Sequence, residues 1–250
     1  MWSGYYTAAS GMVSTLTQLD VVTNNLANMT TPGFKKDVAH FQTANYRTEP
    51  ETPGEENLFR RILNSQSTLA GTKTDFSSGP MVTTGRNLDL AIQGEGFFVV
   101  RTPQGDRYTR QGALQINEKG ELVSASGAQL LDKNNAPVTI PGNTVHFTEN
   151  GDVFSDGVYV TALKVVKFDK PEGLSKEGTG LYTAAQGTKE TILETPQVRS
   201  GTLEKSNVSI EEAMGDLIRI QRTFEFQERV MTTLLNDVAR KTTEEVGRPT

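Results

Sequence analysis

Of the side chains that carry out catalysis or bind metals, histidine is rare in this sequence, cysteine is absent, and the acidic residues are not spaced to act together. His40 and His146 are the only histidines, and their separation rules out a helical His pair that binds zinc. There is no cysteine, which excludes a thiol nucleophile, a disulfide and a cysteine metal site. The segment GEGFFV at 94–99 begins like a dinucleotide-binding loop but lacks the third glycine and opens no helix. We therefore expect no catalytic residue, no metal site and no cofactor.

Composition narrows the class of protein further. The chain has 250 residues, enough for one large domain or two, and 23 of them are glycine, which indicates many turns. A net charge of −5 argues against nucleic-acid binding, which normally requires a basic face. The first residues lack the basic start and apolar core of a cleaved signal peptide. Because no run of about 18 apolar residues follows, we expect no membrane insertion.

The N-terminal segment has the pattern of an amphipathic helix. Its apolar stripe advances by four and three residues, through Met12, Leu16, Leu19, Thr23 and Leu26. Pro32 disfavours helical geometry at the residue before it, and Gly33 allows a turn, so the helix should end near Ala27 or Asn28. Residues 31–75 show no lasting period, and we expect an extended linker there.

The middle of the chain, residues 76–200, is predicted to be all-β. Short runs rich in β-branched and aromatic residues alternate with turn sequences at regular intervals: LDLAI, FFVV, ALQI, ELV, VTI, VHF and VYVTALKVVKF. This spacing is typical of an antiparallel sandwich or barrel-like domain.

A second, longer helix is predicted near the C-terminus. Ser209 and Glu212 form a capping box at its start, and Gly247 marks its end. Apolar residues recur every seven positions at Leu217, Phe224, Met231 and Val238, flanked by Ala213, Ile220 and Leu234 on one side and by Met214 and Leu235 on the other. The polar Thr23 and Gln227 lie within the two stripes and would weaken an isolated pair of helices.

The fold class is therefore α+β, with an all-β middle domain between two terminal helices. The helices could cover the sheet, as in an ordinary α+β protein. Alternatively, residues 1–30 and 207–247 could form a coiled-coil domain that buries its stripes against other subunits.

Three motifs in the same order resemble the rod and hook proteins of the bacterial flagellum. The first comprises TAASGM, NNLAN and TPGFKK; the second is GEGFFVVRTPQGDRYTRQGALQINEKGELVSASGAQLL; the third is SGTLEKSNVSIEEAMGDLIRIQRTFEF. Together they cover nearly the whole chain except about 46–75. Within the family, the resemblance is greater to the proximal-rod member than to the distal-rod member.

This resemblance implies a structural, non-enzymatic subunit of the flagellar basal-body rod, involved in motility. The terminal helices would form the inner coiled coil of a helical assembly, with the β domain around it. The implied partners are the same chain, other rod and hook subunits, and the flagellar type III export apparatus, without a cleaved signal peptide, nucleic acid or membrane insertion. The expected assembly interface is Met12, Leu16, Leu19, Asn24, Asn25, Leu26, Asn28, Leu217, Ile220, Phe224, Met231, Leu234 and Val238.

Two points remain open from the residues themselves. Asparagine amides can bond free backbone groups and neighbouring chains, but Asn28 and Gly33 could equally cap the first helix. Lys35 and Lys36 are expected to be solvated charges near the helix end. The alternative function is a β-sandwich binding module or hydrolase with accessory helices, whose site would be a pocket among the β loops.

Overall fold

The computed structural model describes residues 2–43, 67–178, 180–185 and 187–246. The chain divides into two compact units. Unit 1 comprises Met1–Leu26, Asp37–Lys73 and Ile210–Thr250, and unit 2 comprises Ala27–Lys36 and Thr74–Ser209. The predicted α+β class, with a β-rich middle and a helix near each end, is confirmed.

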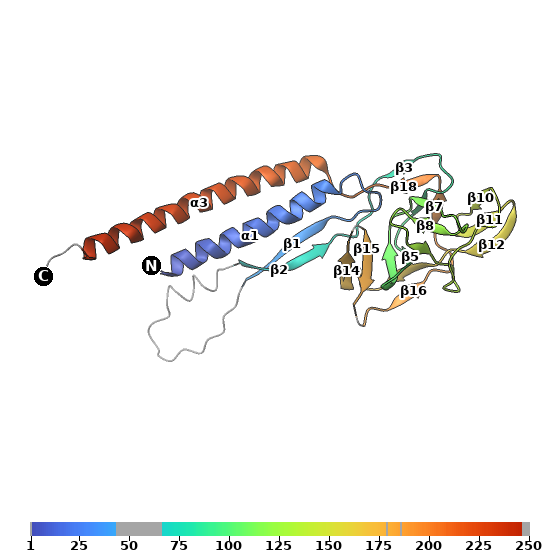
Figure 1. Ribbon diagram of the computed structural model, residues 1–250, viewed down its shortest axis with the longest axis horizontal. Coiled ribbons are helices and arrows are strands. Elements are labelled where there is room, and N and C mark those ends of the chain that lie inside the picture. The colour runs from blue at the N-terminus through green and yellow to red at the C-terminus, as the bar shows by residue number, and fades with distance from the viewer. Residues whose placement is uncertain (1, 44–66, 179, 186, 247–250) are drawn as a thin grey trace. The chain divides into compact units, whose positions relative to one another are not determined.

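Unit 1 contains two long helices and a pair of strands. Helix α1 spans Trp2–Ala27 and helix α3 spans Ile210–Val246. They lie side by side and run in opposite directions (Figure 1). The end of α1 at Ala27 and the start of α3 directly after Ser209 agree with the predicted boundaries. At about 1.5 Å per residue, the 37 residues of α3 extend over roughly 55 Å.

Strands occur where the sequence predicted only an extended linker. Strand β1 spans Asp37–Thr43, strand β2 spans Ser67–Thr74, and the two strands pair. The sequence did not predict these strands because it shows no lasting alternation of apolar and polar residues there. Backbone hydrogen bonds can hold a strand without such a pattern. The Pro- and Glu-rich part of the predicted linker, at 44–66, lies outside the described residues.

Unit 2 consists of short strands joined by turns. Their bounds are β3 Met81–Thr83, β4 Leu90–Ile92, β5 Phe97–Thr102, β6 Gly105–Thr109, β7 Leu114–Ile116, β8 Leu122–Ser124, β9 Gln129–Leu130, β10 Val145–Phe147, β11 Asp152–Ser155, β12 Val158–Ala162, β13 Val165–Phe168, β14 Leu174–Glu177, β15 Leu181–Ala184, β16 Glu190–Ile192, β17 Val198–Ser200 and β18 Thr202–Glu204. A short 3-10 helix, Pro171–Gly173, precedes β14.

The strands of unit 2 pair in an antiparallel manner, as predicted. The largest sheet has the order β14-β15-β6-β5-β9-β8-β7, and β13 pairs with both β5 and β16. A three-stranded sheet, β10-β11-β12, and the pairs β17-β4 and β18-β3 complete the unit. The predicted β-rich run VYVTALKVVKF divides into β12 and β13, which belong to different sheets.

Strand β5 is buried on both faces and organises the core. Phe98 and Val100 belong to the larger apolar cluster, whereas Phe97 and Val99 belong to the second cluster, with Tyr182. Side chains of a strand point alternately to opposite faces, so the run FFVV supplies both clusters. The continuous apolar run in the sequence thus reflects a central strand covered on both sides.

Candidate functional site

Helix α3 has one packed face, and its residues follow a heptad spacing. The side chains on this face are buried or half-buried: Ala213, Leu217, Ile220, Phe224, Gln227 and Met231. Their separations are four, three, four, three and four residues, the pattern of a coiled-coil seam. Leu217, Ile220, Phe224 and Met231 were all predicted for the stripe. The side chains of Leu234 and Val238 lie outside the described residues.

The packed face of α1 differs in part from the predicted stripe. Met12, Leu19 and Leu26 are half-buried, as expected for members of the stripe. Leu16, however, is 44% exposed, and Thr23 is exposed as well. The most buried side chain near the middle of the helix is Thr15, at 4% exposed. An α-helix has 3.6 residues per turn, so the sequence pattern locates the centre of its apolar face only to within about one position. Packing of α1 against α3 determined which side chain is buried at that centre.

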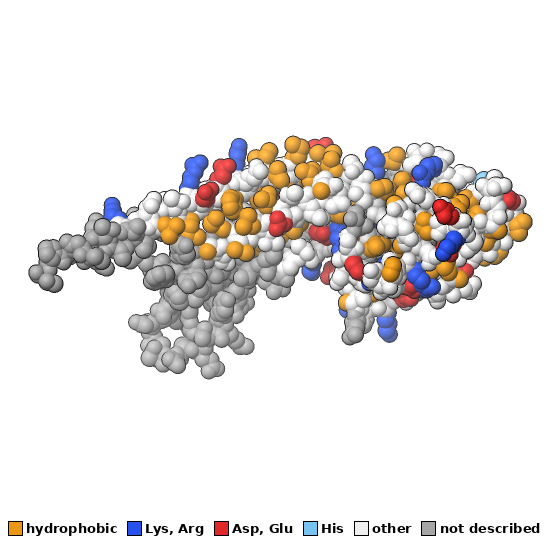
Figure 2. All heavy atoms as spheres, viewed as in Figure 1, with side chains coloured by type: hydrophobic (Ala, Val, Ile, Leu, Met, Phe, Trp, Pro, Cys, Tyr) orange, Lys and Arg blue, Asp and Glu red, His pale blue; other side chains and the backbone are white. Residues whose placement is uncertain are grey.

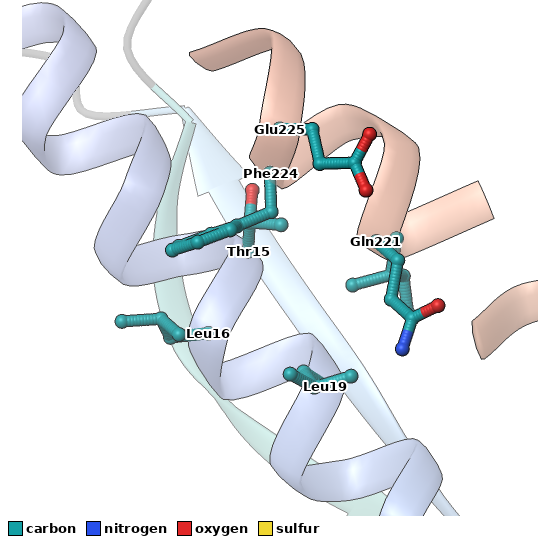
Figure 3. A pocket seen from close by; sticks show the side chains of 7 residues that line it. Thr15, Leu16, Leu19, Gln221, Phe224 and Glu225 are labelled. Atoms are coloured by element: carbon teal, nitrogen blue, oxygen red, sulfur yellow. The ribbon is translucent and has the colours of Figure 1, made fainter. Parts of the chain in front are cut away.

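A groove of about 270 Å³ lies between the two helices of unit 1. Its lining comes from both helices: Thr15, Leu16, Leu19, Ile220, Gln221, Phe224 and Glu225. Figure 3 shows the ring of Phe224 reaching from α3 toward α1 beside Thr15. The groove is not an enclosed cavity, so an apolar side chain from another helix could enter it.

A polar contact joins the helices at one end of the groove. Thr15 Oγ1 lies 3.0 Å from Gln227 Oε1 and 2.9 Å from the carbonyl oxygen of Gly11. A β-carbon on Gly11 would lie 3.3 Å from Nε2 of Gln227. The two helices are therefore close at Gly11, and Gln227 fills the space that a larger residue there would occupy.

The predicted asparagines have different environments. Asn25 is buried, and its amide both donates to the Asp37 carbonyl, at 2.8 Å, and accepts from the Asp37 N–H, at 2.9 Å. Asn24 is exposed, and Asn28 Oδ1 accepts a hydrogen bond from the Thr31 hydroxyl at 3.4 Å. Asn25 thus fastens the start of β1 to the last turn of α1.

Both helices also carry exposed apolar side chains, of which Leu16 borders the groove. Figure 2 shows hydrophobic side chains gathered along the two helices on the face in view. Those at least 37% exposed are Val13 and Leu16 on α1, and Ile210, Met214, Ile218, Phe226, Val230 and Leu235 on α3. Several of them repeat at intervals of four residues, which forms a ridge of the kind that packs into the groove of another helix.

A buried charge cluster, consisting of Lys35, Arg110 and Glu204, lies in unit 2. Lys35 Nζ is 2.6 Å from Glu204 Oε1 and donates to the Ser77 carbonyl at 2.7 Å. Arg110 Nη1 is 3.4 Å from Glu204 Oε2. All three side chains are at most 4% exposed. The prediction that Lys35 is a solvated charge is therefore wrong, because the fold places a carboxylate and a carbonyl around its ammonium group.

Burial and pairing oppose each other in this cluster. Desolvation lowers the pKa of the Lys35 ammonium, while the hydrogen bond and the charge of Glu204 act to raise it. Desolvation also lowers the pKa of the Arg110 guanidinium, again against the charge of Glu204. Arg110 further donates to the carbonyl oxygens of Ile92 and Gly94, at 3.3 and 2.7 Å. The cluster is a structural charge network in which the Lys35 ammonium and both Nη groups of Arg110 are directed at fixed acceptors, whereas Nε of Arg110 is buried without a hydrogen-bond partner.

The cluster joins the segments of unit 2 that lead to elements of unit 1. Lys35 lies between α1 and β1 in the sequence, Ser77 follows β2, and Glu204 precedes α3. Asn207 reinforces the junction, since its amide accepts from the Lys36 N–H at 2.7 Å and donates to the Asp75 carbonyl at 2.9 Å. The three charged residues belong to the motifs TPGFKK, DRYTRQG and LEKSNV. Their spacing along the chain does not predict that they are in contact in the folded protein.

Within the described part of the chain, no group of three or more His, Cys, Asp or Glu residues is placed to hold a metal ion. Among the described residues, no helix combines the length and apolar character needed to cross a membrane.

Comparison with known proteins gives matches to three family domains and to whole relatives. The domains are the flagella basal body rod protein domain at residues 6–35, the flagellar hook protein FlgE/F/G D1 domain at 91–155, and the C-terminal domain of flagellar basal body rod FlgEFG proteins at 199–235. These ranges contain the three motifs noted in the sequence, except for Lys36, the last residue of the first motif.

Two relatives match over almost their whole length. The chain is 33% identical to the flagellar basal-body rod protein FlgG of Borreliella burgdorferi over 251 residues, covering 93% of this chain and 95% of that protein. It is 31% identical to FlgF of Caulobacter vibrioides over 255 residues, covering 99% of each. Since both kinds of relative match, the predicted preference for the proximal-rod member, FlgF, over the distal-rod member, FlgG, stays a prediction. The chain belongs to the family of bacterial flagellar basal-body rod proteins.

Proposed function

We propose that this protein is a structural subunit of the flagellar basal-body rod and assembles there through its terminal helices. Its relatives are named as rod proteins and match along the whole chain. A rod subunit needs contact surfaces rather than a reaction centre, which agrees with the scarcity of catalytic residue types in the sequence. The proposed partners are further copies of this chain and other rod and hook subunits, reached after passage through the flagellar export apparatus.

In this proposal, the residues of unit 1 act in two layers. The seam between α1 and α3 forms the inner coiled coil of the subunit and sets the shape of the helical pair. Of the thirteen interface residues expected from the sequence, seven contribute to this layer: Met12, Leu19, Leu26, Leu217, Ile220, Phe224 and Met231. The exposed apolar side chains, such as Ile218 and Phe226, form the second layer and contact neighbouring subunits.

The exposed apolar ridge of α3 is the observation that carries the proposal. Ile218 is 49% exposed and Phe226 is 67% exposed, although large apolar side chains are more stable when buried. Exposed apolar side chains gathered along one element are typical of protein interaction surfaces. A helical array would bury such a ridge in every subunit.

The alternative of a binding module or hydrolase has weaker support. A hollow of about 860 Å³ lies beside residues 169–173 and 187–189, where a β-loop pocket would be expected. Its charged lining residues, Asp169, Lys170, Glu172 and Lys189, are all exposed. Ligand sites instead bury most of the ligand among apolar side chains with a few converging polar groups.

The test is incorporation of ridge variants into basal bodies. Ile218→Asp and Phe226→Asp should abolish incorporation and motility while leaving the melting temperature of the purified chain within a few degrees, because both side chains are already exposed. Glu228→Ala and Arg229→Ala, on the same helix, serve as matched controls and should be mild, since both side chains are exposed and such surface substitutions usually change stability by less than about 0.5 kcal/mol. Normal incorporation of both ridge variants would contradict the proposal.

A further inference from the structure

The contact between Thr15 and Gln227 is chemically unlike the rest of the helical seam. Thr15 is 4% exposed, and Gln227 is half-buried on a face of α3 whose other packed residues are apolar. One hydroxyl hydrogen cannot serve both the Gly11 carbonyl and Oε1 of Gln227 at the same time. Rotation of the Gln227 amide exchanges its oxygen and nitrogen. The amide can then donate to Thr15 while Thr15 donates to Gly11, so that all three groups are bonded.

A heptad seam without this contact would have several similar registers. The packed residues of α3 repeat by four and three, so a slip of seven residues places apolar side chains against apolar side chains again. When every layer is apolar, the seam itself adds little to the free-energy difference between such registers, and a slip is then opposed by the bonds of Asn207 to Lys36 and Asp75 rather than by the seam. A polar side chain at one seam position removes this degeneracy, because it is satisfied only opposite its own partner.

Gly11 adds a steric condition to the polar one. A β-carbon on residue 11 would lie only 3.3 Å from Nε2 of the Gln227 amide. Glycine within a helix lowers helix stability by about 1 kcal/mol relative to alanine, so Gly11 destabilises α1 slightly. Residues 11 and 15 lie one turn apart on the same face of α1. The glycine leaves room for the Gln227 side chain, and the hydroxyl of Thr15 provides a hydrogen-bond partner for its amide.

We propose that Gly11, Thr15 and Gln227 form a register lock that selects one alignment of α1 against α3. The lock adds specificity rather than stability to the helical pair. The register decides which exposed residues of α1 lie beside the ridge of α3, and therefore which surface the pair presents. That last consequence rests on the proposed function, whereas the register itself does not.

Cross-linking can measure the register directly, because the chain contains no cysteine. Leu19 and Ile220 line the same groove, so Leu19→Cys with Ile220→Cys reports the native alignment. Leu19→Cys with Ala213→Cys reports an alignment shifted by one heptad. A bis-maleimide shorter than the ~10 Å spanned by seven helical residues distinguishes the two. The yield of cross-linking within a single chain is measured on denaturing gels for each cysteine pair. Each pair is tested twice, once with the seam otherwise unaltered and once together with Thr15→Val and Gln227→Leu.

With the lock intact, the native pair should cross-link roughly tenfold more than the shifted pair, the preference expected from one hydrogen bond and one avoided unpaired amide. In the double variant this ratio should fall to within about threefold, while the melting temperature does not decrease, because both polar groups are removed together. Thr17→Val is the matched control, since the Thr17 hydroxyl donates to the Val13 carbonyl within α1, at 3.1 Å.

Three results would each overturn the register lock. One is an unchanged ratio in the double variant, and another is an equal loss of the ratio in Thr17→Val. The third is the absence of a preference for the native pair in the unaltered seam. All three are measured on the purified chain, so they are independent of whether the ridge variants enter the rod.

Discussion

Lys35 and Glu204 form a buried ion pair although 169 residues separate them in the chain, with 2.6 Å between Nζ and Oε1. Glu204 Oε1 also accepts from the Gly79 N–H at 2.9 Å, so one carboxylate joins three segments of unit 2. The pair adds attraction only where the surrounding bonds offset the cost of removing both charges from water. The cluster therefore matters most when one member is missing.

Replacing Glu204 by leucine should destabilise unit 2 by about 3–5 kcal/mol, because Lys35 and Arg110 would remain buried without their carboxylate. Lys35→Met should cost less, since Arg110 still faces Glu204. Lys36→Met is the matched control, because its ammonium is 3.8 Å from Asp75 and about a third exposed. Urea denaturation followed by circular dichroism measures all three. Equal effects of Lys35→Met and Lys36→Met would show that burial of Lys35 has no energetic consequence.

Gly33→Ala should be far more damaging than Gly85→Ala. Both glycines have positive φ angles, +68° and +74°, which cost an alanine about 1–2 kcal/mol. A β-carbon at Gly33 would also lie 2.4 Å from the Arg110 carbonyl oxygen, whereas nothing lies within 4 Å at Gly85. The clash should raise the cost at Gly33 to roughly 2–5 kcal/mol. Thermal unfolding compares the two variants, and similar melting temperatures would refute the steric argument.

Asn25→Ala should loosen the junction between α1 and β1. Its amide makes two hydrogen bonds with the Asp37 backbone, and their loss should cost about 1–3 kcal/mol. Hydrogen exchange should show faster exchange of the Asp37 amide and of the last turn of α1. Asn24→Ala, at an exposed neighbouring position, provides the comparison. Equal protection of Asp37 in both variants would contradict the role given to Asn25.

Asp156→Asn should reduce stability at neutral pH but not in acid. Hydrogen bonds from the Thr144 hydroxyl and from the backbone N–H groups of Thr144 and Asn143 hold the pKa of Asp156 below its usual value. A carboxyl whose pKa is lower in the folded state stabilises the fold above its unfolded pKa of about 3.9 and loses this effect as the pH falls. The gap between the melting temperatures of the two proteins should therefore narrow between pH 6 and pH 3, to roughly nothing below both pKa values. A constant gap would exclude this explanation.

The sequence by itself determined the features that depend on neighbouring residues. Pro32 and Gly33 predicted the end of α1, Ser209 the start of α3, and the heptad spacing its packed face. The turn sequences predicted most of the β strands, because turn chemistry and alternation act over a few residues. The three motifs indicated the family of flagellar rod and hook proteins, because they occur in the same order along this chain.

Tertiary structure alone decided what depends on distant partners. Burial of Lys35 requires Glu204, which no local pattern can indicate across 169 residues. Thr15 rather than Leu16 faces the seam because Gln227 lies opposite it, and a helical period does not resolve adjacent positions. Strands β1 and β2 were missed because each is held by pairing with the other rather than by its own sequence. A side chain's environment is set by long-range contacts, and these exist only once the chain has folded.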